Sequence, residues 1–79
     1  MADKYTHEEL TRRLGSPGWK VITGNETMPV NGTLKEMIET TYDRRRSGLA
    51  SGYIQELETS VEVDMLQIQA LWHQLGLPV

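Results

Sequence analysis

The sequence contains no cysteine among its 79 residues. Neither a disulfide framework nor a zinc site with thiolate ligands can therefore stabilise the chain. A domain of this size buries only about 60% of its unfolded surface, so its single hydrophobic core is barely sufficient. We treat residues 1–79 as one small domain and expect association with another chain to supply the missing stabilisation.

Long apolar segments are also absent. No run approaches the roughly 20 residues that cross a bilayer, and the first residues are charged and lack the apolar region of a signal peptide. We therefore expect a cytoplasmic protein without a membrane segment. The two Asn-x-Thr sequons, at Asn25 and Asn31, are then interpreted as turn and cap sequences rather than glycosylation sites.

Motifs for catalysis and cofactor binding are missing as well. The sequence has no nucleophile elbow, no phosphate-binding glycine loop and no cofactor fingerprint. Paired carboxylates such as Glu58 and Glu62 resemble solvated surface groups, whereas acid–base catalysis needs carboxylates in a cleft. The two histidines, His7 and His73, have no second ligand at metal-binding spacing. We expect no enzyme, no cofactor and no metal site.

Two stretches begin with a capping box, in which a threonine and a glutamate three residues later satisfy the first free amides of a helix. Thr6-His7-Glu8-Glu9 opens one stretch and Thr33-Leu34-Lys35-Glu36 opens the other. We predict a short helix over about residues 6–14 and a longer helix over about 33–46. A helix of about nine residues is unstable alone in water, so the first must pack against the rest of the chain.

The longest helix-compatible stretch is residues 53–75, which we predict to be one helix. Its apolar side chains recur at helical spacing on a stripe roughly 80° wide. This stripe consists of Ile54, Leu57, Val61, Met65, Ile68, Trp72 and Leu75. Gly76, Leu77 and Pro78 end the helix, because glycine accepts a left-handed cap and Leu77 can fold back on Trp72 in a Schellman motif.

The spacing Gly48-x-x-x-Gly52 separates the second predicted helix from the third. It fits either a small-residue face for close helix packing or a simple connection. One uninterrupted helix would place the two apolar stripes on opposite sides, and each interior glycine would cost roughly 1 kcal/mol. We favour two helices in an antiparallel hairpin over one bent helix.

Residues 19–30 lack a helical period. Trp19-Lys20-Val21-Ile22-Thr23 is rich in β-branched side chains, and Gly24-Asn25 is a turn sequence. A hairpin about this turn would place Trp19 opposite Val30. An irregular extended loop packed on the helices is the alternative, because a lone two-stranded hairpin is marginally stable.

A second apolar face on the third predicted helix suggests a partner. Val63, Leu66 and Ala70 lie roughly opposite the main stripe, and a surface helix of a monomer has no reason to carry them. We therefore predict a mainly α fold whose helical hairpin associates with a second copy into a symmetric dimer with a four-helix core. Trp72 would anchor this core, and Trp19 would seal the extended segment against it.

Asp64 is unexpected at the margin of the main stripe. An unpaired buried charge is very costly, so we expect Asp64 to meet an arginine of Arg44-Arg45-Arg46 or a tyrosine hydroxyl. Such a residue can fix the register of paired helices. The alternative is a half-exposed position that needs no partner.

Charge is unevenly distributed around the net value of −3. Residues 33–46 hold one lysine and three arginines against three acids, whereas residues 47–79 hold no lysine or arginine. The basic cluster Arg44-Arg45-Arg46 falls in the last turn of a predicted helix, where the helix dipole favours cations. Contact of this cluster with phosphates is the alternative interpretation, but no helix-turn-helix or zinc-finger sequence accompanies it.

Two functional hypotheses follow. The leading one is a small non-catalytic adaptor or regulatory protein, homodimeric, that binds another protein through a helical surface. Its contact residues would be Val63, Asp64, Leu66, Ala70 and Trp72. The alternative is a nucleic-acid-binding regulator that uses Arg44, Arg45 and Arg46.

Overall fold

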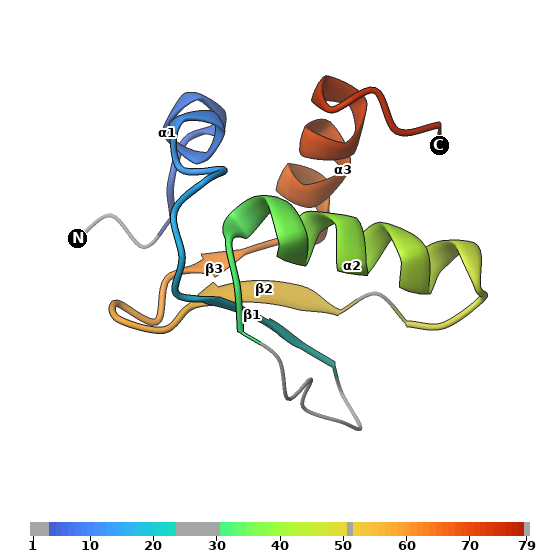
Figure 1. Cartoon of the computed structure of the whole chain (residues 1–79), viewed down its shortest axis with the longest axis horizontal. Coiled ribbons are helices and arrows are strands. Elements are labelled where there is room, and N and C mark those ends of the chain that lie inside the picture. The colour runs from blue at the N-terminus through green and yellow to red at the C-terminus, as the bar shows by residue number, and fades with distance from the viewer. Residues whose placement is uncertain (1–3, 24–30, 51, 79) are drawn as a thin grey trace.

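The computed structural model describes residues 4–23, 31–50 and 52–78. Within these ranges the elements follow the order α1 (His7–Arg12), β1 (Trp19–Ile22), α2 (Leu34–Arg46), β2 (Tyr53–Glu56), β3 (Glu62–Val63) and α3 (Met65–Gln74). The helices lie on one side of an antiparallel sheet (Figure 1). The fold is therefore α+β, and the prediction of a mainly α fold is wrong. None of the helices in the described ranges is long and apolar enough to cross a bilayer.

The sheet has β2 in its centre, with β1 and β3 antiparallel on either side. Val21, Ile54 and Val63 lie next to one another across the three strands, and all three are completely buried. Because side chains alternate along a strand, this row faces the helices. The adjacent row, Lys20, Gln55 and Glu62, faces the other way.

The prediction of one helix over residues 53–75 is wrong in its first half. Residues 53–56 pair with β1, the chain turns through residues 57–59, and residues 62–63 return along β2. Ser60 adopts a left-handed conformation at this turn, with φ of 63°. The predicted helical hairpin and four-helix core do not form, since half of the predicted third helix belongs to a sheet.

The other predicted helices are present at nearly the predicted places. α1 and α2 both start with the expected capping boxes, at Thr6 and Thr33. The end of α3 is the predicted Schellman motif: Gly76 has φ of 77°, and the Leu77 N–H donates to the Trp72 carbonyl at 3.0 Å. Local capping chemistry therefore determines these three boundaries.

The predicted hairpin over residues 19–30 falls largely outside the described residues. β1 is a strand as expected, but its partner along its whole length is β2. The backbone of Trp19 also exchanges two hydrogen bonds of 3.0 Å with Gly32. Val30, the predicted partner of Trp19, is outside the described ranges.

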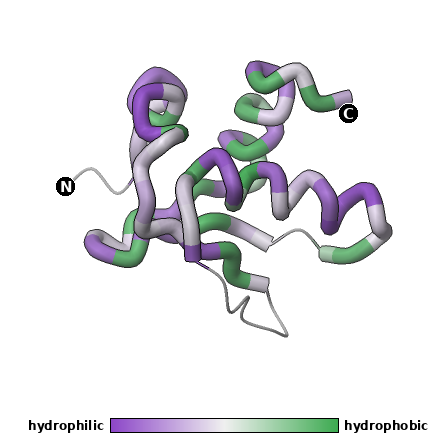
Figure 2. The backbone as a smooth tube through the Cα atoms, viewed as in Figure 1, coloured by the Kyte–Doolittle hydropathy of each residue, from purple (hydrophilic) through white to green (hydrophobic). Residues whose placement is uncertain are grey.

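The core lies between the sheet and the three helices. Trp72 links α3 to α2, since its Nε1 donates to the Ile38 carbonyl at 3.1 Å. Figure 2 shows hydrophobic and hydrophilic residues alternating along α3, and a hydrophilic last turn in α2. The buried apolar residues are Leu10, Trp19, Val21, Leu34, Met37, Ile38, Tyr42, Ile54, Val63, Ile68, Leu71 and Trp72.

The connection from α2 to β2 contains both glycines of the Gly48-x-x-x-Gly52 spacing. Both have positive φ, 78° and 73°. A Cβ added at Gly52 would lie 2.1 Å from the carbonyl oxygen of Ile22, so only glycine fits against β1 there. Of the two interpretations of this spacing, the connection is correct.

Candidate functional site

Asp64 caps the N-terminus of α3. Its carboxylate accepts a hydrogen bond of 3.0 Å from the Gln67 N–H, and the Gln67 side chain accepts one of 3.3 Å from the Asp64 N–H. The two residues thus form a capping box. The spacing Asp64-x-x-Gln67 signals a helix start in the sequence, but the apolar stripe running through it pointed to a continuous helix.

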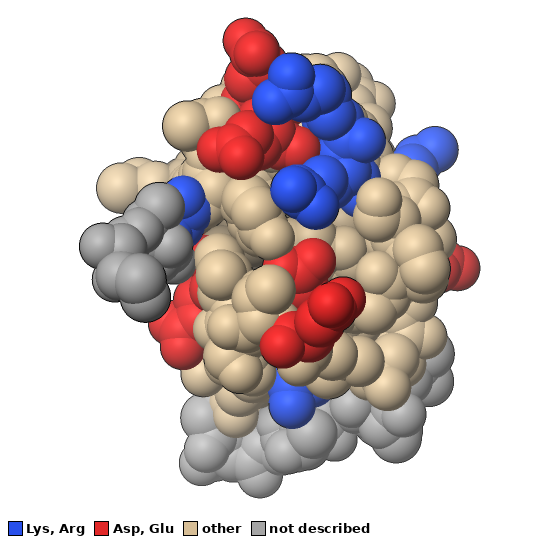
Figure 3. Space-filling model, turned by 90° about the vertical axis from the view of Figure 1, so that its left-hand side faces the viewer, with Lys and Arg blue, Asp and Glu red and all other residues tan. Residues whose placement is uncertain are grey.

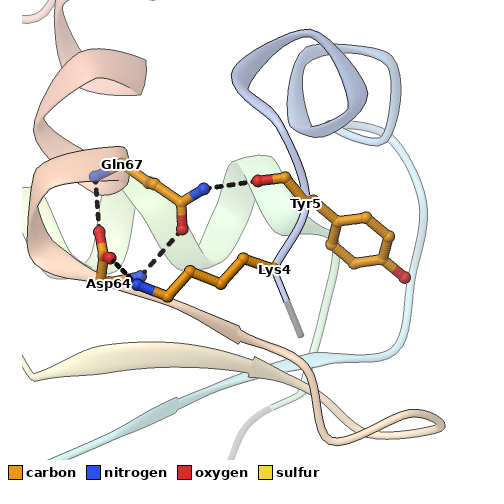
Figure 4. Close-up of polar contacts among 4 residues, drawn as sticks. All are labelled: Lys4, Tyr5, Asp64 and Gln67. Atoms are coloured by element: carbon orange, nitrogen blue, oxygen red, sulfur yellow. Dashed lines mark hydrogen bonds and ion pairs between the residues drawn. The ribbon is translucent and has the colours of Figure 1, made fainter. Parts of the chain in front are cut away.

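The same two residues hold the segment before α1 (Figure 4). The Lys4 ammonium forms an ion pair with the Asp64 carboxylate, and the Gln67 Nε2 donates to the Tyr5 carbonyl at 2.6 Å. The hydrogen bond from the Lys4 ammonium, followed by the bond from the Gln67 N–H, lowers the pKa of Asp64. The expected contact of Asp64 with Arg44, Arg45, Arg46 or a tyrosine hydroxyl is therefore replaced by one with Lys4.

Tyr5 connects the segment before α1 to strand β2. Its hydroxyl donates to Glu56 at 2.5 Å, and this hydrogen bond to a carboxylate is the main reason why the pKa of Tyr5 is raised. The Arg13 guanidinium lies 4.5 Å from the centre of the Tyr5 ring, and the ring lies 6.0 Å from that of Trp19. Tyr5 is thus a protonated side chain that covers part of the core.

The two sides of α3 differ sharply in burial. Ile68, Leu71 and Trp72 face inwards and are completely buried. Leu66 is 77% exposed and is the most exposed large apolar residue of the described chain, and Ala70 follows it one turn later, also exposed. At 100° per residue, Leu66 and Ala70 point in nearly the same direction.

The structure divides four of the five predicted contact residues into two groups, and the fifth, Asp64, is the partly buried N-cap of α3. Val63 and Trp72 are completely buried inside their own chain, because Val63 belongs to β3 and Trp72 packs on α2. Leu66 and Ala70 lie on the surface. We call Leu66, Ala70 and His73, which is exposed one turn further along, the outer face of α3.

The outer face of α3 carries no aspartate, glutamate, lysine or arginine, since none occurs from Met65 to Pro78. Figure 3 shows a contrasting surface, seen from the side of α1 and the turn between β2 and β3, where acidic and basic side chains are mixed. On α1, for example, Arg12 lies 3.6 Å from Glu8. The outer face of α3 thus presents the apolar side chains of Leu66 and Ala70 beside the imidazole of His73, without any of these four charged residue types.

The predicted basic cluster, Arg44-Arg45-Arg46, lies in the last turn of α2. The Arg44 Nε donates to the Ala50 carbonyl at 2.8 Å. The guanidinium groups of Arg45 and Arg46 lie over the rings of Trp72 and Tyr42, at 5.9 and 5.7 Å from their centres. Arg45 and Arg46 therefore pack on aromatic rings. All three arginines also place positive charge at the C-terminal end of α2, where the helix dipole favours cations.

The histidines lie on different elements. The His7 Nε2 lies 2.5 Å from the Gln74 Oε1, where it joins α1 to α3, and His73 is exposed on α3. In the part of the chain that the structure describes, no three His, Cys, Asp or Glu side chains are grouped so that they could hold a metal ion.

Comparison with known proteins gives no match: the chain resembles no family model, no curated protein and no solved structure closely enough to indicate a family. The function is therefore inferred from the surface of the molecule itself. Its most distinctive feature is the outer face of α3.

Proposed function

We propose that the protein is a small non-catalytic module that binds another protein through the outer face of α3. The observation that carries this proposal is Leu66, which is 77% exposed on a helix face without charged side chains. Exposed apolar side chains with few charged neighbours are typical of the centre of a protein interface. The proposal keeps the cytoplasmic location that the sequence predicts.

The free energy of burying Leu66 supports this surface as a binding site. Burying a leucine side chain contributes roughly 1.5–3 kcal/mol, so covering Leu66 would add substantially to binding. The helix is already fixed by Trp72, by the Asp64–Gln67 capping box and by the Schellman motif at Gly76. A fixed helix loses little conformational freedom on binding, which favours affinity.

The alternative function, nucleic-acid binding through Arg44, Arg45 and Arg46, has less support. Arg45 and Arg46 lie over aromatic rings of their own chain, and the net charge of −3 opposes approach to a polyanion. We therefore place the contact surface on α3 and treat the arginine cluster as part of the fold.

Site-specific photo-crosslinking in the native cell extract tests the proposal. A photoreactive amino acid is placed at Ala70 in one variant and at Leu49 in another. Leu49 is a matched control, because it is 54% exposed but lies in the connection after α2. We expect discrete protein adducts from position 70 and none from position 49. Equal labelling at both positions, or no adduct from position 70, would refute the proposal.

A further inference from the structure

We propose that residues 4–13, which we call the N-terminal strap, open away from the sheet, α2 and α3 as one unit while the rest of the chain stays folded. The strap consists of the segment before α1, α1 itself and its C-cap Arg13. It stands at one end of the molecule and contributes no strand to the sheet (Figure 1). The outer face of α3 belongs to the part that stays folded.

Side-chain contacts near the surface attach the strap at both of its ends. Lys4 and Tyr5 make the contacts with α3 and β2 described above. At the other end of α3, the Gln74 Oε1 lies 2.5 Å from the His7 Nε2 and accepts a hydrogen bond of 3.3 Å from the Thr11 Oγ1. When the strap opens, these groups exchange their bonds for bonds to water, so each contact contributes little net stability.

The apolar attachment of the strap is also small. Among the buried apolar residues of the described ranges, only Leu10 lies in the strap, and the others belong to the strands, α2 and α3. The six residues of α1 are too few to remain helical alone, so the released strap gains conformational entropy. Few buried apolar contacts and many surface hydrogen bonds are the marks of a segment that opens before the whole protein unfolds.

The rest of the fold keeps its own bonds when the strap opens. The three strands remain paired, the Trp72 Nε1 still donates to the Ile38 carbonyl, and the capping boxes of α2 and α3 lie outside the strap. The chain is anchored again directly after the strap, because the Lys35 N–H donates to the Leu14 carbonyl at 2.9 Å. Opening therefore bends the chain between Arg13 and Leu14.

Trp19 favours the open form in one respect. Its side chain is completely buried, and the centre of its ring lies 6.0 Å from that of Tyr5. In the described part of the chain its Nε1 has no hydrogen-bond partner, and a buried donor without a partner is costly. Opening removes Tyr5 from one side of the Trp19 ring, so water can pair this N–H and lower the free energy of the open form.

Native-state hydrogen exchange, measured by NMR, tests whether the strap opens separately. Gly48→Ala lies in the connection after α2, where the added Cβ meets no atom within 4 Å, so it destabilises the closed and the strap-open forms equally. Exchange of the Tyr42 and Ile68 amides, which requires unfolding of α2 and α3, should accelerate about fivefold. The Leu10 and Arg13 amides should stay within about twofold. Equal acceleration of all four amides would overturn the inference.

Two further variants test whether the strap moves as one unit. Tyr5→Phe removes the hydrogen bond to Glu56, and Gln74→Ala removes the contacts at the other end of α3. Each should accelerate exchange of the Leu10 amide at least about threefold. The matched control His73→Ala, at an exposed position next to Gln74, should change this rate less than about twofold. Acceleration by only one of the two variants, or by neither, would indicate local fraying of α1 and overturn the inference.

Discussion

Asp64 combines two contacts that are each modest alone. It caps α3 and pairs with Lys4 in the segment before α1. Asp64→Ala should lower the free energy of unfolding by about 1 kcal/mol, because a lost N-cap typically costs this much. Asp64→Asn keeps a capping side chain and loses only the ion pair, so it should cost less. Urea unfolding of both variants at pH 7 measures the difference.

The pH dependence of these variants follows from the pKa of Asp64, which the contact with Lys4 holds below its ordinary value in the folded protein. The folded state then binds fewer protons than the unfolded state, so the stabilisation is complete above about pH 5 and is lost as the pH falls below about 4. The difference between wild type and Asp64→Asn should therefore shrink between pH 7 and pH 3. A constant difference would show that the ion pair does not contribute.

Gly48 and Gly52 allow backbone strain to be compared with and without a steric clash. Both have positive φ, but only Gly52 lies against another strand, at the Ile22 carbonyl. Gly48→Ala should cost about 1 kcal/mol, the cost of a left-handed alanine. Gly52→Ala should cost more than about 2 kcal/mol, since a clash is added to the same strain. Thermal and urea unfolding would contradict this packing if the two variants were equally stable.

At the scale of elements, the apolar spacing of residues 53–75 is misleading. Ile54 and Leu57 are spaced like neighbours on a helix, yet Ile54 is buried in β2 and Leu57 is 42% exposed in the following turn. A strand, a tight turn and a second strand happened to repeat apolar residues at intervals that a helix would also produce. Periodicity alone does not distinguish the two over so short a stretch.

Signals that depend on neighbouring residues were predicted better. The capping boxes at Thr6 and Thr33 and the Schellman motif at Gly76 are present as expected, because each is made within a few residues of the chain. Pairing of β1 with β2 joins segments far apart in sequence, so no local pattern specifies it. The Asp64-x-x-Gln67 spacing was the one local sign that a new helix starts there.

A pair of alanine variants tests the sheet against the predicted helix. Ile54→Ala should lower the free energy of unfolding by about 2–5 kcal/mol, since it opens a cavity between sheet and helices. Leu57→Ala should cost less than about 1 kcal/mol, because the side chain is partly in solvent. A helix with both residues on its buried stripe predicts similar losses. Urea unfolding of the two variants therefore separates the two folds.

In the whole molecule, the burial of each side chain in and next to α3 depends on the strands and helices that pack against it. The sequence placed Val63, Leu66 and Ala70 on one face, but β3 takes Val63 into the core and leaves Leu66 and Ala70 outside. The helical spacing thus correctly placed Leu66 and Ala70 on one side of the helix, opposite its buried stripe. Val63 was misplaced, because the start of α3 at Asp64 was not recognised.

The charge of the whole molecule leads to a prediction about nucleic acids. The net charge is −3, and Arg45 and Arg46 lie over aromatic rings. We therefore expect the dissociation constant for duplex DNA or RNA to exceed about 0.1 mM even at low salt. Fluorescence anisotropy across salt concentrations measures this. Tight binding that falls steeply with salt, and is lost in an Arg44→Ala/Arg45→Ala/Arg46→Ala variant, would restore the alternative function.

In the described residues α3 follows the other helices and the strands along the chain, and this order has a consequence for synthesis on the ribosome. Trp19, Ile38 and Ile54 leave the exit tunnel before Ile68 and Trp72, which cover them in the finished fold. A nascent chain that has not yet released α3 therefore exposes an incomplete core, the condition that attracts chaperones and promotes aggregation. Translation pauses before residue 68 should accordingly prolong chaperone association, whereas the released chain, in which α3 covers the core, should lose it.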